Sequence, residues 1–372
     1  MLETRPDVAL FLPSLRGGGA ERVMMDLSRA FADAGRAVDV VVLNRLGALS
    51  DDLGPGVRLV DLDRRRAALA LPALVRYLGR NRPKALLSTL EHTNVMAVLA
   101  ARLVGGIRVV VREANTPSSD LAGMGTKGRA LRAAMRWAYR RADSVVAVSR
   151  GVSDGLVSAL GLRPDRIRVI FNPVLTPRVL EGARAVPDHP WFADGETPVV
   201  LGVGRLSEQK GFDVLLRAFA DVRARERCRL VILGDGPLRE GLVDLAVELG
   251  VREDVDLPGF AANPFAHMAR CGVFVLSSRW EGLPNVLIQA LASGAQVVAT
   301  DCPSGPSEVL DDGRYGRLVP VDDVAAMAAA IAEALHAPKP PPPPTWSDRY
   351  AVAHVARAYL DELLPSGTGE PT

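Results

Sequence analysis

Two cations and a carboxylate stand directly after apolar runs in the second half of this 372-residue chain. Arg205 and Lys210 lie in the segment GVGRLSEQKGFDVLL, where Arg205 follows an expected strand and Lys210 opens the next helix. Glu281 follows a further apolar run, 272–276, in the segment SSRWEGLPNV. The carboxyl ends of parallel strands form the ligand-binding edge of an open sheet. Two cations beside the free backbone amides of a helix start are typical of a phosphate site at such an edge.

A helix with further polar groups is predicted directly after this carboxylate. Pro284 suits the first turn of a helix, Gly294 ends it, and a second apolar run follows at 296–300. This order of strand, helix and strand is the unit of a parallel sheet. Asn285 and Gln289 are four residues apart and therefore share one helix face. Their amides can bind sugar hydroxyls, although a capped surface helix explains the same pattern.

The order of apolar runs and helical patterns predicts an α/β fold with two doubly wound parallel sheets. The expected strands are 7–15, 38–43, 57–60, 85–87, 109–111, 145–148 and 167–170 in the first half, and 198–206, 230–233, 255–257, 273–276 and 296–299 in the second. Four prolines break up the stretch between the halves. We therefore predict an N-terminal Rossmann-like domain at 1–175, a linker at 176–197 and a C-terminal domain at 198–337.

A proline run follows the second domain. Residues 338–344 are prolines except for one lysine, which predicts a stiff extended tether. A helix is expected at 345–364, and the tether gives it room to pack back on the first domain. A ligand for proline-binding domains is the alternative interpretation of this run.

Loops with glycine or polar residues follow three expected strands of the first half. Gly18 and Gly19 precede a helical pattern, and such a turn lets a ligand approach the backbone. The turn lacks the spacing G-x-G-x-x-G, so the sequence gives no support to a dinucleotide-dependent oxidoreductase. Glu91 and His92 follow one further strand, and Arg112 ends another. A lone histidine in such a loop is more often a helix-start residue than a catalyst.

The composition bounds the class of protein. With 48% hydrophobic and 24% charged residues, the chain is globular and long enough for two domains. The net charge is +2, but residues 1–175 hold 27 Lys/Arg against 16 Asp/Glu, which favours an anionic surface or substrate on that side. Cys228, Cys271 and Cys302 lack metal-ligand spacing and are expected to be buried thiols in a reducing compartment. No leader pattern and no 18-residue apolar stretch is found, so we expect a cytoplasmic protein without a spanning helix.

One helix of the basic half, expected at 127–141, carries arginines on a single side. At about 100° per residue, its four regularly spaced arginines fall within roughly 80° of arc. These arginines are Arg129, Arg132, Arg136 and Arg140. A solvated face is one interpretation, and a face that lies on anionic lipid headgroups is the other. Nucleic acid is not expected as a partner, because no aromatic platform is interleaved with the charges.

Together these motifs resemble the donor site of the retaining glycosyltransferases of family 4, which have the GT-B fold. The resemblance rests on EGLPNVLIQALASG followed by DCPSGPSEVL, and on GVGRLSEQKG. It implies two Rossmann-like domains that face a cleft and a C-terminal helix that crosses back to the first domain. It also implies transfer of a hexose or N-acetylhexosamine from a nucleotide-diphosphate sugar, with uridine as the expected base. The implied acceptor is a hydroxyl of a glycan or lipid-linked glycan in bacterial polysaccharide or lipopolysaccharide biosynthesis.

The resemblance implies roles for individual residues. Arg205 and Lys210 match the residues that hold the donor diphosphate, and Glu281 matches an acid that contacts the donor sugar. Further donor contacts are implied for Gly18, Gly19, Gly204, Gly259, Phe260 and Asn285. Acceptor-side contacts are implied for Glu91, His92 and Arg112. The family places a second acid on the ribose where this chain has Gln289, whose amide can pair with a diol but lacks the charge that strengthens such bonds.

Neither a metal nor another cofactor is expected. At 4 Å and an effective dielectric constant of about 20, each cation contributes about 4 kcal/mol to the leaving diphosphate before desolvation, so the two cations can replace a metal. The family also implies that the donor phosphate accepts the proton of the acceptor, so no separate base is needed. One alternative is a nucleotide-sugar hydrolase or epimerase of the same fold, for which only Glu91 and His92 offer acid–base groups. Another is a catalytically weakened binding protein, in which Gln289 marks the lost activity.

Overall fold

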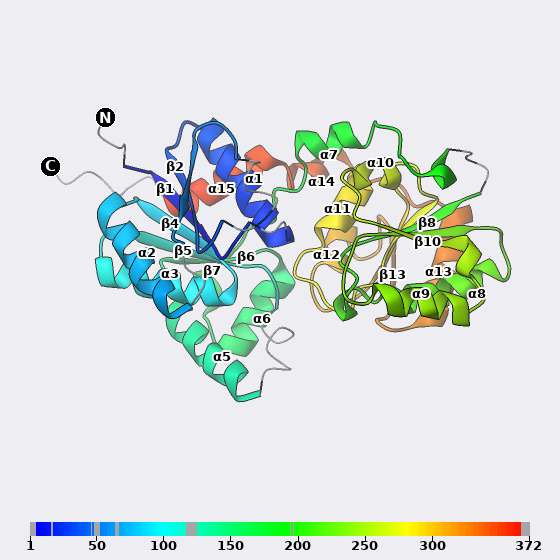
Figure 1. The fold of residues 1–372 in the computed structure, drawn as a ribbon, viewed down its shortest axis with the longest axis horizontal. Helices are drawn as coiled ribbons and strands as arrows, with labels where there is room; N and C mark the ends of the chain where they lie inside the picture. Colours follow the sequence, from blue (N-terminus) through cyan, green and yellow to red (C-terminus); the bar gives the residue numbers. More distant parts are fainter. Residues whose placement is uncertain are drawn as a thin grey trace. The chain divides into compact units, whose positions relative to one another are not determined.

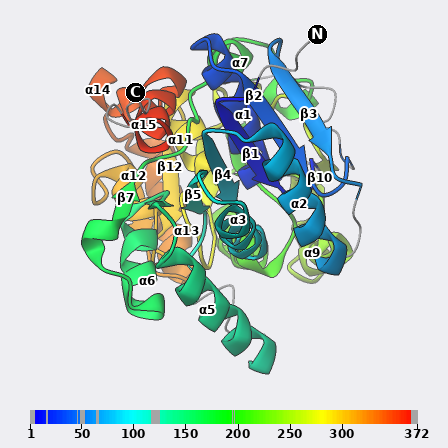
Figure 2. The same cartoon turned by 90° about the vertical axis from the view of Figure 1, so that its left-hand side faces the viewer.

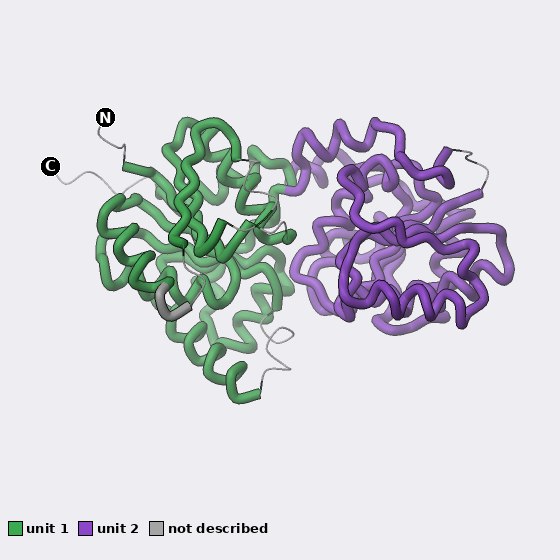
Figure 3. Tube along the Cα trace, viewed as in Figure 1, with its two compact units in different colours: residues 1–173, 349–372 green, residues 174–348 purple. Residues whose placement is uncertain are grey.

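The computed structural model describes residues 5–15, 18–45, 47, 53–63, 67–116, 125–193, 195 and 197–365. The chain divides into unit 1, residues 1–173 and 349–372, and unit 2, residues 174–348 (Figure 3). Each unit has one parallel sheet with helices on both of its faces (Figure 1). The predicted doubly wound α/β class is therefore confirmed.

Over its described residues, the sheet of unit 1 has the strand order β3-β2-β1-β4-β5-β6-β7, with every pair parallel. Its strands are β1 Val8–Leu12, β2 Val38–Val42, β3 Val57–Asp61, β4 Ala85–Thr89, β5 Arg108–Glu113, β6 Ser144–Ala147 and β7 Ile167–Val169. The strands β1, β2 and β4 are fully buried, and β1 is a continuous apolar run, as expected of a sheet covered on both faces. The order reverses between β1 and β4, which is where such sheets place ligands at their carboxyl edge.

Helices cover both faces of this sheet. They are α1 Gly19–Asp33, α2 Ala67–Asn81, α3 Glu91–Val104, α5 Gly125–Tyr139, α6 Arg150–Leu160 and α15 Val352–Leu363, with a 3-10 turn η2 Pro164–Arg166. The C-terminal helix α15 packs against α1 (Figure 2). Its residues Val355 and Tyr359 join Phe31 in one core. The predicted return of the C-terminal helix to the first domain is thus confirmed.

The segment predicted as one helix at 345–364 is divided between the units. Its first part forms α14, Pro344–Asp348, in unit 2, and the helix of unit 1 starts only at Val352. The indole of Trp346 is buried, and its Nε1 donates to the carbonyl of Val309 at 2.9 Å. This bond holds α14 on unit 2. The chain therefore passes from unit 2 to unit 1 after α14, and not before it as predicted.

The sheet of unit 2 has the order β10-β9-β8-β11-β12-β13, again with parallel pairs. Its strands are β8 Val199–Val203, β9 Arg229–Leu233, β10 Val255–Gly259, β11 Val273–Leu276, β12 Val297–Thr300 and β13 Arg317–Val319. Its helices are α7 Pro177–Gly182, α8 Phe212–Arg223, α9 Arg239–Glu248, α10 Pro264–Met268, α11 Asn285–Ala292, α12 Pro306–Leu310 and α13 Val324–His336, with 3-10 turns η3 Pro190–Phe192, η4 Glu208–Lys210 and η5 Arg252–Asp254. The edge strand β13 is missing from the sequence prediction.

The segment 176–197, predicted as a linker, packs on unit 2. It forms α7 and η3, and the ring of His189 is buried. His189 Nε2 lies 2.9 Å from Asp256 Oδ2 in β10, and the rings of Trp191 and Phe192 meet the histidine edge-on. These contacts hold the part of the predicted linker around His189 against unit 2, although prolines interrupt its helices. The cleft expected between the two units stays a prediction.

Candidate active site

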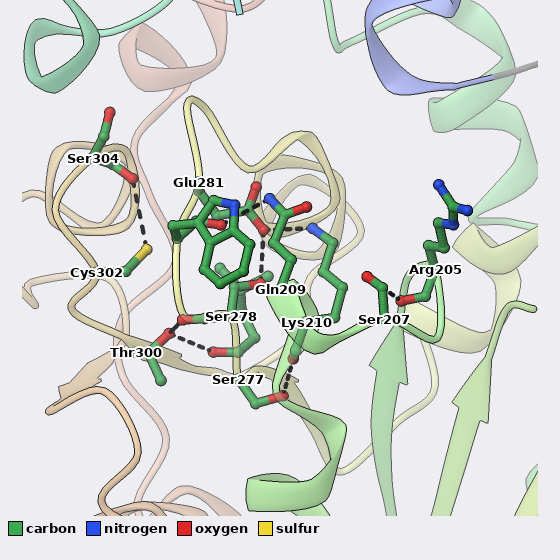
Figure 4. A network of polar contacts seen from close by, with 12 residues as sticks. Arg205, Ser207, Gln209, Lys210, Ser277, Ser278, Glu281, Thr300, Cys302 and Ser304 are labelled. Carbon is green, nitrogen blue, oxygen red and sulfur yellow. Dashed lines mark hydrogen bonds and ion pairs between the residues drawn. The ribbon is translucent and has the colours of Figure 1, made fainter. Parts of the chain in front are cut away.

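The loops after β8 and β11 bring Lys210 and Glu281 together at the carboxyl edge of the unit 2 sheet (Figure 4). Lys210 ends η4, and Glu281 lies between β11 and α11. The ammonium Nζ is 2.5 Å from the carboxylate Oε1, and the two side chains are 17% and 8% exposed. A short pair with so little access to water is screened much less than a surface pair. The sequence placed both residues at this edge but did not predict that they pair.

The carboxylate of Glu281 is held by one of its two oxygens. Ser278 Oγ donates to the same Oε1 at 2.7 Å, and Ser278 is itself buried. Thr300 Oγ1, at the end of β12, donates to the carbonyl of Ser278 at 2.5 Å. This bond holds the loop that carries Ser278 and Glu281 against the neighbouring strand. The other oxygen, Oε2, makes no hydrogen bond with any described residue. Glu281 therefore keeps one acceptor available to a ligand hydroxyl.

A glycine allows the two loops to meet. Gly211 has φ +59°, and a Cβ at this position would lie 2.1 Å from the carbonyl oxygen of Ser277. Ser277 Oγ also donates to the carbonyl of Lys210 at 2.7 Å. The stem of Lys210 runs over Gly204, where a Cβ would lie 3.4 Å from three of its carbons. Gly204, predicted as a donor contact, thus makes room for the lysine stem.

Arg205 does not join this pair. Its side chain is exposed and extends away from Glu281, and its guanidinium makes no hydrogen bond or ion pair with any described residue (Figure 4). The convergence of Arg205 and Lys210, predicted from their spacing, is therefore not seen: Lys210 faces a carboxylate, and Arg205 faces solvent. An exposed arginine without a protein partner can change rotamer to meet an anion. Its role at a diphosphate stays a prediction.

Three glycines line the same edge of the sheet at the ends of neighbouring strands. Gly204 N donates to the carbonyl of Leu233 at 2.9 Å, and Gly234 N donates to the carbonyl of Gly259 at 2.7 Å. Gly234 has φ +138°, and a Cβ there would lie 1.9 Å from the carbonyl oxygen of Gly204. Phe260 follows these glycines and is 77% exposed. Glycines leave the backbone accessible at this edge of the sheet, and the ring of Phe260 is exposed beside them. Such a surface suits the flat face of a nucleotide base.

The two amides of α11 occupy its first two turns. Asn285 is its first residue and Gln289 lies one turn further on, and both are partly exposed. The side chain of Gln289 makes no hydrogen bond with the described residues. It is therefore available for the ribose contact that the resemblance implies, which stays a prediction.

In unit 1 the glycine turn is held by an acid that the sequence analysis missed. Gly18 N donates to Glu21 Oε2 at 2.9 Å, and Ser14 Oγ donates to Glu21 Oε1 at 2.7 Å. Glu21 is buried in the first turn of α1, where a negative charge is favourable. A capping box normally begins with serine or threonine, and the glycine here hides that signal. A Cβ on Gly19 would meet no atom of a described residue within 4 Å, so the space beside this glycine is open.

The three acceptor-side candidates lie in different environments. Glu91 and His92 are in the first turn of α3, and the imidazole is exposed. Arg112 is only 1% exposed: its Nη1 donates to Thr89 Oγ1 at 2.9 Å and its Nη2 to Asn172 Oδ1 at 2.6 Å. An acceptor cannot reach a guanidinium that is enclosed in unit 1. We therefore assign Arg112 a structural role in place of the predicted acceptor contact.

A buried polar network continues from the next residue of β5. Tyr139 OH donates to Glu113 Oε2 at 2.5 Å, and Asn94 Nδ2 donates to the phenol oxygen at 2.8 Å. Burial, reinforced by the charge and hydrogen bond of Glu113, raises the pKa of Tyr139 well above its usual range. The phenol is therefore a permanent donor, and the network ties α3 and α5 to β5.

The remaining expectations concern metals, thiols and membrane spans. Within the described ranges, no group of three or more His, Cys, Asp or Glu side chains is placed to hold a metal ion. Cys228 and Cys302 are buried as expected, Cys271 is partly exposed, and burial raises the pKa of the Cys302 thiol to about 12. None of the helices formed by the described residues has both the length and the apolar character needed to span a bilayer.

The arginine-bearing helix has the predicted orientation. In α5, the side chains of Arg129, Arg132 and Arg136 are exposed, whereas Met135 and Ala138 are buried. Arg140 lies just past the helix, and its Nη2 donates to the carbonyl of Gly161 at 3.1 Å. Contact of this face with a membrane stays a prediction.

Comparisons with known proteins agree with these motifs. Residues 197–337 match the family model described as glycosyl transferases group 1, and residues 17–178 match glycosyltransferase family 4. The chain is 33% identical over 238 residues, 64% of its length and 63% of the relative's, to an N-acetylgalactosamine-N,N'-diacetylbacillosaminyl-diphospho-undecaprenol 4-alpha-N-acetylgalactosaminyltransferase of Campylobacter jejuni. It is 37% identical over 193 residues, 52% of its length and 54% of the relative's, to the lipopolysaccharide core biosynthesis glycosyltransferase LpsE of Rhizobium meliloti. These matches span less than two thirds of either relative.

Solved structures show the same fold. A structure of Anabaena Alr3699/HepE in complex with UDP aligns with a TM-score of 0.72 and 20% identity, over 96% of this chain and 95% of that one. At this identity the likeness concerns the fold alone.

Proposed function

Because the chain belongs to family 4 of the glycosyltransferases, we propose that it transfers a hexose or N-acetylhexosamine from a UDP-linked sugar to a hydroxyl of a glycan or lipid-linked glycan. The observation that carries the proposal is the Lys210–Glu281 pair, with one free carboxylate oxygen, at the ligand-binding edge of unit 2. The named activities of the Campylobacter and Rhizobium relatives support the sugar class and the acceptor class. The UDP complex of a protein with this fold supports the choice of base.

In the proposed reaction Lys210 stabilises the leaving group. The bond between the anomeric carbon and the diphosphate oxygen breaks, and its electron pair stays on the diphosphate. An ammonium has three N–H donors, and Glu281 occupies one of them, so two remain for phosphate oxygens. Lys210 can thus bind the donor without leaving Glu281. A preorganised charge of this kind needs no reorganisation during the reaction.

Glu281 orients the donor sugar in this proposal. Its Oε2 accepts a sugar hydroxyl, while Oε1 stays with Lys210 and Ser278. The acceptor oxygen then bonds to the anomeric carbon on the face that the diphosphate leaves, and its proton passes to the departing phosphate oxygen. The configuration at that carbon is retained. In this proposal the departing phosphate takes the proton of the acceptor, so the reaction needs neither a metal nor a separate protein base.

We place the reaction at the cytoplasmic face of the membrane, with the enzyme bound peripherally. The support is the exposed arginine face of α5 in the basic half of the chain. The name of the Campylobacter relative, which includes a diphospho-undecaprenol-linked sugar, points to an acceptor of that class. Gly18 and Gly19 stay candidate donor contacts, as the resemblance implies, and the space beside Gly19 is open.

The test is a donor panel with the full chain. We expect UDP release from a UDP-hexose or UDP-N-acetylhexosamine only when an acceptor is present, and a product whose anomeric configuration matches that of the donor by NMR. Release without an acceptor would identify a hydrolase. Donor binding without release, over the whole acceptor panel, would identify a binding protein. Either result replaces the proposal.

A further inference from the structure

Arg279 lies on the loop that carries Glu281, but its guanidinium points to other residues than the pair. Nη1 and Nη2 donate to the two oxygens of Asp213 at 3.1 and 2.8 Å. Nε donates to Asp322 Oδ1 at 2.7 Å, and Nη1 also donates to the carbonyl of Glu208 at 2.8 Å. The side chain is 20% exposed. One arginine therefore links four segments of unit 2.

The segment at the centre of these links is the single turn η4, which ends at Lys210. Short 3-10 turns have poor hydrogen-bond geometry and little stability of their own. Arg279 N donates to the carbonyl of Gln209 at 2.8 Å, and Gln209 Nε2 donates to the carbonyl of Trp280 at 2.9 Å. The turn is thus bound to the neighbouring loop along its length. The Arg279 side chain extends this binding to the start of the turn.

The ion pair with Asp213 is the firmest of these links. A bidentate pair of arginine and carboxylate combines charge with fixed geometry. Burial alone would raise the pKa of Asp213, but the hydrogen bond and charge of Arg279, together with backbone hydrogen bonds, outweigh it and hold that pKa below its usual value. Asp213 lies in the first turn of α8, directly after η4. The Arg279 side chain therefore holds the turn at both ends, through the carbonyl of Glu208 and through Asp213.

We propose that Arg279 is a positioning residue, which holds η4 so that the Lys210 ammonium stays against Glu281 and in place for the donor diphosphate. The identity of the ligand rests on the proposed function, but the holding of the turn does not. Arg279 acts through Lys210 and does not itself need to touch the donor. The competing account is a through-space effect, in which the positive charge of Arg279 alone stabilises the leaving group.

Three single variants distinguish the two accounts. Arg279→Gln removes the ion pairs of the guanidinium with Asp213 and Asp322. Arg279→Lys keeps the positive charge but cannot form the bidentate pair with Asp213. Asp213→Asn keeps the arginine but weakens its anchor. Positioning predicts a fall in kcat of about tenfold for all three, with the donor KM changed less than threefold, because small misplacements of a catalytic group are costly. It also predicts that Arg279→Gln with Asp213→Asn is no worse than either change alone.

The through-space account predicts a different pattern. Arg279→Lys would then keep turnover, and Asp213→Asn would raise it, because the neutralised carboxylate no longer offsets the positive charge. Either result overturns the proposal. Arg223→Gln is the matched control, because Arg223 also pairs with an aspartate of unit 2, Asp254, at 2.7 Å. We expect this control to leave kcat unchanged.

Hydrogen exchange on the ligand-free protein tests the holding of the turn independently of any activity. We expect the amides of 207–211 to exchange at least tenfold faster in Arg279→Gln than in wild type, with the amides of β8 and β11 unaffected. If wild type releases no nucleotide but the exchange result holds, the proposed function fails and the positioning of η4 stands. If exchange and kcat of Arg279→Gln both stay within twofold of wild type, the positioning role is wrong.

Discussion

Lys210 Nζ lies 2.5 Å from Oε1 of Glu281, a residue 71 positions further along the chain. Because Ser278 donates to the same oxygen, the pair has a fixed geometry before any ligand arrives. A lysine on its own would be a mobile point charge on a flexible stem. The carboxylate turns it into a preorganised donor group.

The first prediction concerns Lys210→Ala. We expect turnover to fall roughly 10²- to 10³-fold, as for the loss of one preorganised charge-stabilising donor. Release of UDP under saturating donor is the measurement, and Lys339→Ala is the control because it removes another lysine of unit 2. Turnover within twofold of wild type would show that the diphosphate is stabilised elsewhere. Since the cations replace a metal in this proposal, a chelator should leave the wild-type rate unchanged.

The second prediction concerns the neutral Gln289. Gln289→Leu should weaken donor binding by about 0.5 to 1.5 kcal/mol, the usual net contribution of one hydrogen bond. Gln289→Glu should strengthen it, because a charged acceptor makes shorter and stronger bonds with hydroxyls. Calorimetry with UDP measures both variants. If neither change alters the Kd, the ribose is bound by other residues.

The sequence predicts the parallel strands well because their burial makes them continuous apolar runs. The run 272–276, for example, yields β11, Val273–Leu276. The edge strand β13 was missed because Gly316 and Pro320 flank it and leave only two adjacent apolar residues, Leu318 and Val319. Strand ends also indicate which residues share an edge of the sheet, which is why Lys210 and Glu281 could be placed there.

Spacing along the chain does not give side-chain direction. Arg205 and Lys210 are five residues apart, yet one faces solvent and the other faces Glu281. Arg112 looks like any polar residue at a strand end until its contacts with Thr89 and Asn172 are known. Such partners come from distant parts of the sequence, so only the tertiary structure identifies them.

The third prediction tests the structural role of Arg112. Arg112→Met should lower the free energy of unfolding, because it leaves Thr89 and Asn172 without this buried donor. Each lost hydrogen bond to a charged group costs about 1.5–3 kcal/mol. Urea unfolding measures the loss, and Arg163→Gln, a change on the surface of unit 1, should leave the midpoint unchanged. An unaltered midpoint for Arg112→Met, together with a raised acceptor KM, would restore the acceptor contact.

The fourth prediction is a pH dependence that comes from His267. Burial lowers the pKa of this imidazole, although the carbonyl of Asn263 and the charge of Asp188 act in the opposite direction. As the pH falls below about 6.5, the unfolded chain takes up the proton before the folded chain does. The free energy of unfolding should therefore decrease with falling pH until the folded pKa is passed, with a slope of at most about 1.4 kcal/mol per pH unit.

Urea unfolding between pH 7.5 and 5 measures this slope. His267→Gln should flatten it in that range, whatever its effect on stability at pH 7.5. His336→Gln serves as the control, because that side chain is 70% exposed and pairs with Glu226 at the surface. An identical slope in wild type and His267→Gln would assign the pH dependence to other groups.

The last prediction is that the arginine face of α5 docks the enzyme on an anionic membrane. Basic residues at such a surface contribute about 1 kcal/mol each, so this face can give reversible binding without an anchor. The attraction should fade with salt, since the Debye length falls from ~10 Å at 0.1 M to ~3 Å at 1 M. Co-sedimentation with vesicles that contain anionic lipid is the measurement. The test variant changes Arg129, Arg132, Arg136 and Arg140 to glutamine.

The control variant must remove the same charge from another surface. A suitable set of exposed arginines in unit 2 is Arg217, Arg225, Arg227 and Arg314. If α5 is the docking face, the control variant sediments like wild type at low salt and the α5 variant stays in solution. Equal loss in both variants would mean that net charge alone drives binding. Equal sedimentation of the α5 variant and wild type would make this face ordinary solvated surface, with Arg140 serving only to cap the end of α6 at Gly161.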